Sequence, residues 1–341
     1  MPPRRPASPP DRAPAAAAAV GRFADVRGHE RAITHLRRGF EAGRLAHAFV
    51  FTGPEGVGKL TVARLLAAGL HCDVAPFDAC GGCGACRTIA AGTHPDVRIV
   101  AGPLDGKRDI SIEQVRDLQR ELGFRSLSQH PKVGIIDDAH LLTAQAQNAL
   151  LKTLEEPSGD SVLVLVAVQQ SALLPTILSR CQRVSFGPLP TADVVAILER
   201  RGRSATEARA LAAYADGSPG VALGLDPELF DRRRRELLTA LAGLRGADFK
   251  KLVDFAQTLA GEDKDPAAVL ALVASWHRDL LRRAVLGADA ELQNADLAAA
   301  IGTPDVGRSL RNLETTYDTM RALRRNANRN LALVRMLMRF E

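Results

Sequence analysis

The stretch FTGPEGVGKLTV, residues 51–62, decides the fold that we expect. It nearly matches the phosphate-binding pattern G-x-x-x-x-G-K-[ST], because Gly53, Gly58 and Lys59 are in place. The next position, where a hydroxyl group would bind Mg²⁺, is Leu60. The stretch therefore predicts either a working nucleotide site or the scaffold of one that serves another purpose.

The residues around this stretch supply the context that a phosphate loop needs. Residues 31–54 have the pattern of an amphipathic helix, a glycine stop and a short buried strand that ends at the loop. Residues 59–72 have helical spacing. A strand, a glycine-rich loop and a helix are thus expected in the order that the motif requires.

Two further buried strands follow, separated by helices. Ser111 and Gln114 form a capping-box pattern at the start of one helix. The stretch KVGIIDDAHLL (132–142) predicts a buried strand ending in two carboxylates, and SVLVLVAV (161–168) predicts a central strand. A helix over residues 143–156 lies between them and stops before a proline. This alternation predicts an α/β fold with a parallel sheet covered on both faces.

The chain has 341 residues, which is more than one hydrophobic core usually organises. Pattern and composition divide it into a disordered tail (1–22), an α/β domain (23–187), a small helical lid (188–226) and an all-helical collar (227–341). In the collar, the run DRRRRE (231–236) predicts a solvated helix face.

Composition excludes some classes of protein. With 46% hydrophobic and 25% charged residues, the chain has the composition of a globular protein that acts in the cytoplasm. It has no apolar run long enough for a membrane helix and no apolar segment typical of a signal peptide. The formal net charge of +6 is compatible with nucleic acid nearby, and a solvated surface explains it equally well.

Four of the five cysteines crowd into one stretch, at Cys72, Cys80, Cys83 and Cys86. Overlapping C-x-x-C steps with glycine between them allow several thiolates to converge on one tetrahedral ion, which predicts a structural Zn²⁺ site. A redox-active dithiol is the alternative. The neighbouring His71 and His94 are expected to be surface or core histidines rather than ligands.

The order of the motifs is more specific than any one of them. A phosphate loop, a four-cysteine insertion, IIDDAH, LLKTLEEP and LLPTILSRCQ follow one another along the chain. This order resembles the bacterial clamp-loader subunits of DNA polymerase III, which belong to the AAA+ superfamily. The resemblance runs from about Phe23 to the C-terminus. That family contains gamma/tau ATPase motors and a non-motor kind that has the same fold and a decayed nucleotide site.

The resemblance implies a set of nucleotide-binding positions, namely Gly53, Gly56, Gly58, Lys59, Thr61 and Asp137. Hydrolysis also needs a hydroxyl on the metal, but position 60 is leucine and Thr61 points about 100° away around the helix. Asp138 stands where motors carry glutamate, and its side chain is one methylene shorter.

Two sensor positions of the motors are also altered. Where the third strand ends, Ala167 and Val168 replace a polar sensor, and the lid stretch GSPG (217–220) lacks a sensor arginine. We therefore expect a subunit without independent catalysis within the DNA polymerase III holoenzyme, one that binds ATP or ADP weakly and does not hydrolyse it.

One catalytic group of the family remains. Arg180 matches the arginine of the SRC motif, which reaches the ATP of a neighbouring subunit. A local salt bridge is the alternative role for this arginine. The resemblance implies gamma/tau and delta subunits as partners in a hetero-oligomer, together with the sliding clamp and, through the complex, primer–template DNA.

Two other functions stay open. An active gamma/tau-type ATPase predicts turnover by the isolated chain. A zinc-containing nucleic-acid-binding module predicts DNA binding with a steep dependence on salt.

Overall fold

The computed structural model describes residues 21–340 except 105–108, 158, 245, 247, 262–265, 291, 301–303, 325 and 326. All but two residues of the expected tail (1–22) lie outside this description. The chain divides into two compact units, Met1–Gly187 and Pro188–Glu341.

The first unit is built on a five-stranded parallel sheet in the order β2-β3-β4-β1-β5. Its strands are β1 (Ala48–Thr52), β2 (Val97–Val100), β3 (Lys132–Ile136), β4 (Ser161–Ala167) and β5 (Gln182–Ser185). All five residues of β1 and all seven of β4 are buried, as the apolar runs predicted. The prediction of a parallel sheet with a central third strand is confirmed.

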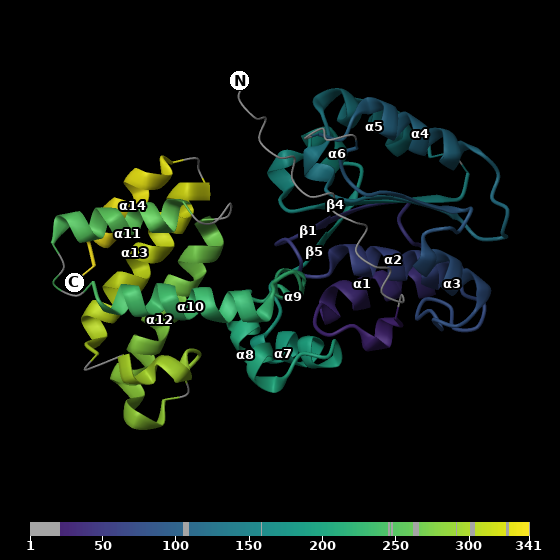
Figure 1. Ribbon diagram of the computed structural model, residues 1–341. Helices are drawn as coiled ribbons and strands as arrows, with labels where there is room; N and C mark the ends of the chain where they lie inside the picture. Colours follow the sequence, from purple (N-terminus) through teal and green to yellow (C-terminus); the bar gives the residue numbers. More distant parts are fainter. Residues whose placement is uncertain are drawn as a thin grey trace, which may run out of the picture. The chain divides into compact units, whose positions relative to one another are not determined.

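Helices cover both faces of this sheet. They are α1 (Glu30–Glu41), α2 (Lys59–Leu70), α3 (Gly84–Ala91), α4 (Ile112–Gly123), α5 (Ala144–Glu155) and the short α6 (Pro175–Leu178). Figure 1 shows α4, α5 and α6 on one side of the strands and α1, α2 and α3 on the other. Because the strands are parallel, their carboxyl ends meet at one edge, where β1 enters the glycine loop and β3 reaches the two carboxylates.

Close packing fixes α4 on the sheet. A Cβ atom at Gly134 of β3 would lie 3.1–3.3 Å from methyl groups of Leu118, Leu122 and Leu163, so glycine lets helix and strand approach. The predicted capping box is present in part, since the Ser111 backbone N–H donates to Gln114 Oε1 at 3.1 Å. Packing and capping together set where α4 begins and which face it buries.

The two edge strands were not predicted. Only one of the four residues of β5 is buried, and two of the four in β2 are. Their sequences therefore lack the continuous apolar run that marked β1, β3 and β4. Edge strands are partly exposed to water, so the apolar pattern in their sequences is weaker than that of central strands.

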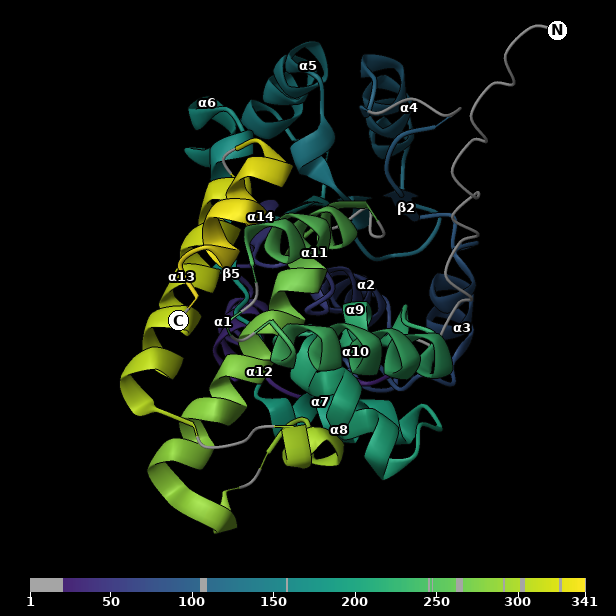
Figure 2. The same ribbon diagram turned by 60° about the vertical axis from the view of Figure 1, so that its left-hand side comes forward.

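In the second unit, the described residues form helices and no strands. The helices are α7 (Thr191–Arg200), α8 (Ala205–Tyr214), α9 (Pro219–Leu223), α10 (Pro227–Ala242), α11 (Phe249–Gly261), α12 (Pro266–Leu286), α13 (Val306–Arg324) and α14 (Arg329–Leu337). Helix α12 packs along α13, and α11 packs on α14 (Figure 2). The split of this unit into lid and collar stays a prediction.

The expectation of a fully solvated arginine run on α10 is wrong for one residue. Arg234 is 4% exposed and donates to Asp296 at 2.7 and 3.0 Å and to Asp231 at 2.8 Å. Asp231 is a local partner three residues earlier on α10, whereas Asp296 is 62 residues away and comes within reach only when the chain folds. No helix in the described part of the chain is long and apolar enough to span a bilayer.

Candidate functional site

The glycine loop follows β1 directly and leads into α2. Gly53 has φ +148°, and a Cβ atom there would lie 2.1 Å from the Phe186 carbonyl oxygen. Gly58 caps the start of α2 in the left-handed region, with φ +105°. The close approach at Gly53 and the backbone turn at Gly58 therefore both require glycine, and the amino end of α2 faces outward as an anion-attracting scaffold.

Lys59 is almost fully buried in this loop. Its Nζ donates to the carbonyl oxygens of Gly53 at 2.8 Å and Pro54 at 2.6 Å. Burial lowers the pKa of Lys59, while the attraction of Asp137, Asp138 and Glu55 opposes that shift. The lysine thus has partners within its own loop, so a bound phosphate would have to replace them.

Asp137 lies beside the loop, as the motif order predicted. Burial raises its pKa, as does the negative charge of Asp138, whereas the positive charges of Lys59 and Arg64 act in the opposite direction. Asp138 takes up a left-handed backbone conformation with φ +50°. The carboxyl end of β3 therefore brings a carboxyl pair and two cations together at the edge of the sheet.

The hydroxyl and sensor positions lie as follows. Leu60 is half-buried and Thr61 is exposed, both in the first turn of α2. Ala167 is buried at the end of β4, where it pairs with Thr52 of β1, and Val168 follows it. Next to the loop, the end of β4 thus offers a methyl group and no polar side chain.

Two residues at the loop were missed by the sequence analysis. His29, at the start of α1, is within 2.8 Å of the Val57 carbonyl oxygen through Nε2, and its ring meets Phe186 edge-on. Arg64 lies one turn after Leu60 on α2 and affects the Asp137 pKa. Spacing on the predicted helix could have suggested Arg64, whereas nothing in the sequence pattern pointed to His29.

Arg180 lies between α6 and β5. Its Nη2 is 2.6 Å from Glu155 Oε1, and its Nη1 donates to the Thr176 carbonyl oxygen at 3.0 Å. About a third of the side chain stays exposed, and so does half of the Glu155 side chain. An exposed ion pair of this kind is weak, so the guanidinium can exchange Glu155 for another anion.

The four cysteines converge after the end of α2. Their sulfur atoms all lie within 4.8 Å of one another, and the Sγ atoms of Cys72 and Cys83 are 3.9 Å apart. Four sulfurs about 2.3 Å from one Zn²⁺ in a tetrahedron would be about 3.8 Å apart. The cluster can therefore hold a metal such as zinc after small adjustments.

Backbone N–H groups support the same cluster. Cys72 Sγ accepts from the N–H groups of Ala75 and Cys80, both at 3.3 Å, and Cys80 Sγ accepts from that of Cys83 at 3.2 Å. Hydrogen bonds from the Gly82 and Cys83 backbone lower the pKa of Cys80 to about 6. Burial raises the pKa of Cys86 to about 12. The cluster thus joins one readily ionised thiol to one whose ionisation needs a cation.

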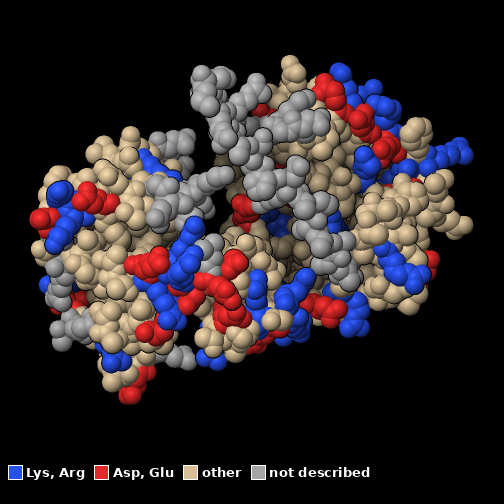
Figure 3. All heavy atoms as spheres, in the orientation of Figure 1, with Lys and Arg blue, Asp and Glu red and all other residues tan. Residues whose placement is uncertain are grey.

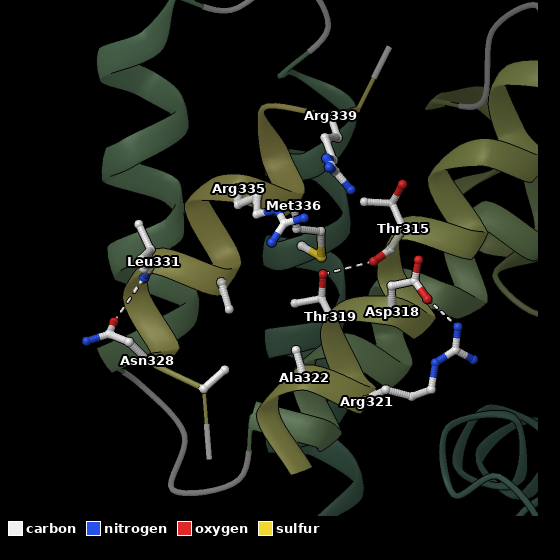
Figure 4. Close-up of a pocket in the computed structure, with 12 residues that line it drawn as sticks. Thr315, Asp318, Thr319, Arg321, Ala322, Asn328, Leu331, Arg335, Met336 and Arg339 are labelled. Atoms are coloured by element: carbon white, nitrogen blue, oxygen red, sulfur yellow. Dashed lines mark hydrogen bonds and ion pairs between the residues drawn. The ribbon is translucent and has the colours of Figure 1, made fainter. Parts of the chain in front are cut away.

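The second unit has a groove of about 440 Å³ between α13 and α14 (Figure 4). It combines small and apolar side chains with three arginines: Thr315, Asp318, Thr319, Arg321, Ala322, Ala327, Asn328, Leu331, Ala332, Arg335, Met336 and Arg339. Arg321 pairs with Asp318, whereas Arg335 of α14 and Arg339, two residues after its end, extend toward α13. Elsewhere, Figure 3 shows basic and acidic side chains intermixed on the face that it draws.

Comparison with known proteins gives concordant matches. Residues 28–190 match the family described as "DNA polymerase III, delta subunit". A Pseudomonas aeruginosa protein named DNA polymerase III subunit delta' is 40% identical over 58% of this chain and 61% of its own length. A Bacillus subtilis protein of the same name is 42% identical over 47% of each chain. The chain thus spans about half to three fifths of the length of these curated relatives.

Proteins named as tau or gamma/tau subunits of DNA polymerase III match as well. The Escherichia coli protein named DNA polymerase III subunit tau is 38% identical over 60% of this chain and 32% of its own length. Among solved structures, a gamma subunit-related protein from Thermotoga maritima covers 90% of this chain at 20% identity and a TM-score of 0.42. The region that matches the family model, residues 28–190, contains the glycine loop, the cysteine cluster and Arg180.

Proposed function

We propose that the chain is the non-motor delta-prime subunit of a clamp loader, because residues 28–190 match the family described as "DNA polymerase III, delta subunit" and two relatives of 40–42% identity are named subunit delta'. In this role it assembles with gamma/tau and delta subunits that load a sliding clamp onto primed DNA in the cytoplasm. One observation carries the proposal: the phosphate loop keeps its backbone geometry while Leu60 and Ala167 occupy the positions of catalytic polar groups.

Within this proposal, the chain's own loop binds ATP or ADP weakly. Gly53, Gly56, Gly58 and Lys59 supply the phosphate-binding scaffold, and Thr61 and Asp137 flank it. Lys59 must first give up its two carbonyl partners, which reduces the affinity. Hydrolysis is not expected, because the residue directly after Lys59 is Leu60, which has no hydroxyl group to hold Mg²⁺.

Arg180 serves a neighbouring subunit. A guanidinium supplied in trans stabilises the charge that develops on the transferred phosphoryl group and contributes on the order of 10³-fold or more in rate. The exposed pair with Glu155 holds the side chain in place until the γ-phosphate of the neighbour replaces the carboxylate. Four thiolates at Cys72, Cys80, Cys83 and Cys86 hold a structural Zn²⁺, and the second unit supplies a lid (188–226) and an oligomerising collar (227–341).

Reconstitution with gamma/tau and delta tests the role of Arg180. We expect Arg180→Ala to lower hydrolysis at the one ATP site that it serves by about 10³-fold, while the complex still assembles. The matched control is Arg183→Ala, because Arg183 is also exposed and lies three residues away on β5. Site-resolved turnover and size-exclusion chromatography are the measurements.

Glu155→Gln separates catalysis from structure. This variant breaks the Glu155–Arg180 ion pair but keeps the guanidinium, so ATP hydrolysis by the complex should be unchanged. If Arg180→Ala and Glu155→Gln both prevent assembly, the arginine is structural and the proposed role in trans is wrong.

An active gamma/tau-type ATPase is the second candidate, and the nearness of Asp137 to Lys59 favours it. It predicts turnover by the purified chain that Lys59→Ala abolishes. Under our proposal the purified chain shows no turnover that depends on Lys59.

A further inference from the structure

Three of the chain's eight histidines lie together next to the cysteine cluster. His71 follows α2, His94 precedes β2 and His130 precedes β3. The ring centroids of His71 and His94 are 4.6 Å apart, and those of His71 and His130 are 5.5 Å apart. Parallel strands and the end of α2 thus bring together rings that are up to 59 positions apart in the sequence.

His71 has a buried nitrogen without a partner. Its ring is 2% exposed, and Nδ1 lies 2.9 Å from the Ala67 carbonyl oxygen. Because a carbonyl only accepts, Nδ1 carries the proton and Nε2 has the free lone pair. Nε2 is buried and has no hydrogen-bond partner. Such a buried acceptor is costly, and an ion or a water molecule at that place would remove the cost.

His130 is oriented in the way typical of metal ligands. Its Nε2 is 3.2 Å from Asp73 Oδ1, and since the carboxylate accepts, Nδ1 is left with the free lone pair. A ring nitrogen that donates to a carboxylate or a backbone carbonyl fixes the tautomer in which the other nitrogen binds metal. His71 and His130 both have such an anchor, from Ala67 and Asp73.

Asp96 is next to the rings but is not available as a ligand. Its carboxylate accepts from the N–H groups of Leu127 and Ser128 and from the hydroxyls of Ser126 and Ser128. Although a donor atom of Asp96 lies within 4.8 Å of those of His71 and His94, these bonds occupy it. Asp96 is also paired with a cation, because Lys132 Nζ lies 3.4 Å from its Oδ1, so the negative charge that it places close to the rings is offset.

A cavity borders His130 of this cluster. It has a volume of about 490 Å³ and is lined by His130, Ser126, Ser128 and Lys132, among others, but by neither His71 nor His94. His130 is half-buried, whereas His71 is fully buried. An ion can therefore meet His130 from solvent, and water from the cavity can complete the coordination there, although the cavity itself does not extend to His71.

We propose that His71 Nε2, His130 Nδ1 and His94 bind a second divalent transition-metal ion of the zinc class, separate from the four-cysteine site. Neutral imidazoles suit zinc, nickel and copper, and three nitrogens with one water make a complete tetrahedral shell. His94 binds only after its Nδ1 gives up the hydrogen bond of 3.2 Å that it accepts from the Asp96 N–H, because that atom holds the only lone pair of the neutral ring. The proposed histidine site does not depend on the clamp-loader proposal, so either can be correct when the other is wrong.

Cobalt provides the test, because its visible spectrum differs between thiolate and imidazole ligands. The full chain, without a histidine tag, is loaded with Co²⁺, dialysed, and analysed for metal content and absorption. We expect two ions per chain, one with thiolate charge-transfer bands and one without. His71→Ala and His130→Gln should each reduce the count to one and keep the thiolate bands. His35→Ala, which changes an exposed histidine of α1, should keep two.

Asp73→Asn tests the anchor of His130. The Asp73 side chain is 86% exposed, so the change should leave the fold intact. We expect the affinity for the second Co²⁺ to fall by about 10–100-fold while the thiolate-bound ion is unaffected. One ion per wild-type chain, or two ions in His130→Gln with unchanged affinity, would overturn the proposal. Because His130 is half-buried, the test holds even if His71→Ala does not fold.

Discussion

The two ends of helix α2 each carry a candidate ligand site, the glycine loop and the cysteine cluster, and the two sites differ in which ligand-binding groups are present. At the amino end, the glycine loop has the backbone geometry of a phosphate site, but Lys59 bonds to the loop itself and no hydroxyl follows it. Past the carboxyl end, four sulfurs converge with N–H donors around them. A loop held by glycines and core packing can thus keep its backbone geometry without a hydroxyl side chain directly after its lysine.

The largest effect is expected at the cysteine cluster. Cys86→Ser removes a buried ligand, and structural zinc sites contribute about 10–16 kcal/mol of binding free energy that is coupled to folding. We expect loss of the metal, a lower melting temperature and rapid hydrogen exchange in α3. Cys181→Ala is the control, because this buried cysteine is outside the cluster. A chain that melts at the same temperature with and without a chelator would contradict the comparison.

At the glycine loop, a large effect on stability is expected from Gly53→Ala. The added Cβ would collide with the Phe186 carbonyl oxygen in a backbone conformation that alanine avoids, so we expect a loss of about 3 kcal/mol in unfolding free energy. Urea denaturation measures it. Gly123→Ala is the control, since a Cβ there would meet nothing within 4 Å. Equal losses in both variants would mean that the loop is not tightly packed.

Asp137 should lower stability at neutral pH. Its folded-state pKa is raised, chiefly by burial, so folding disfavours the ionised form above that pKa and the penalty disappears as the pH falls below the unfolded value of about 3.9. We therefore expect Asp137→Asn to stabilise the fold at pH 7. Unfolding curves between pH 7 and pH 3.5 check the sign. If Asp137→Asn instead destabilises the fold at pH 7 and this loss disappears toward acid, then Lys59 and Arg64 outweigh burial.

The smallest effect is expected from Thr61→Ala. Thr61 is exposed on the first turn of α2, so its removal should change stability by less than about 0.5 kcal/mol. Affinity of the isolated chain for ADP with Mg²⁺, measured by calorimetry, should stay the same. A tenfold weaker affinity would mean that the Thr61 hydroxyl does reach the metal. The amino end of α2 would then resemble the cysteine cluster in having side chains that bind a metal ion.

Sequence reasoning succeeded where local pattern and burial agree. The apolar runs at β1, β3 and β4 predicted the interior of the sheet, and the spacing of glycines placed the loop at the start of α2. It failed for β2 and β5, since edge strands have one wet side and lack a continuous apolar run. It also failed for Arg234, because the partner Asp296 is on a distant segment.

By itself, the sequence determined the inventory of chemistry: a phosphate loop without its hydroxyl, four cysteines at metal-binding spacing and an arginine after a short helix. Only the tertiary structure decided which groups face one another, as with Arg180 and Glu155 or His71 and His130. The physical reason is that motif spacing reports neighbours within a few residues, whereas pairing, burial and pKa depend on contacts that form when distant segments pack together.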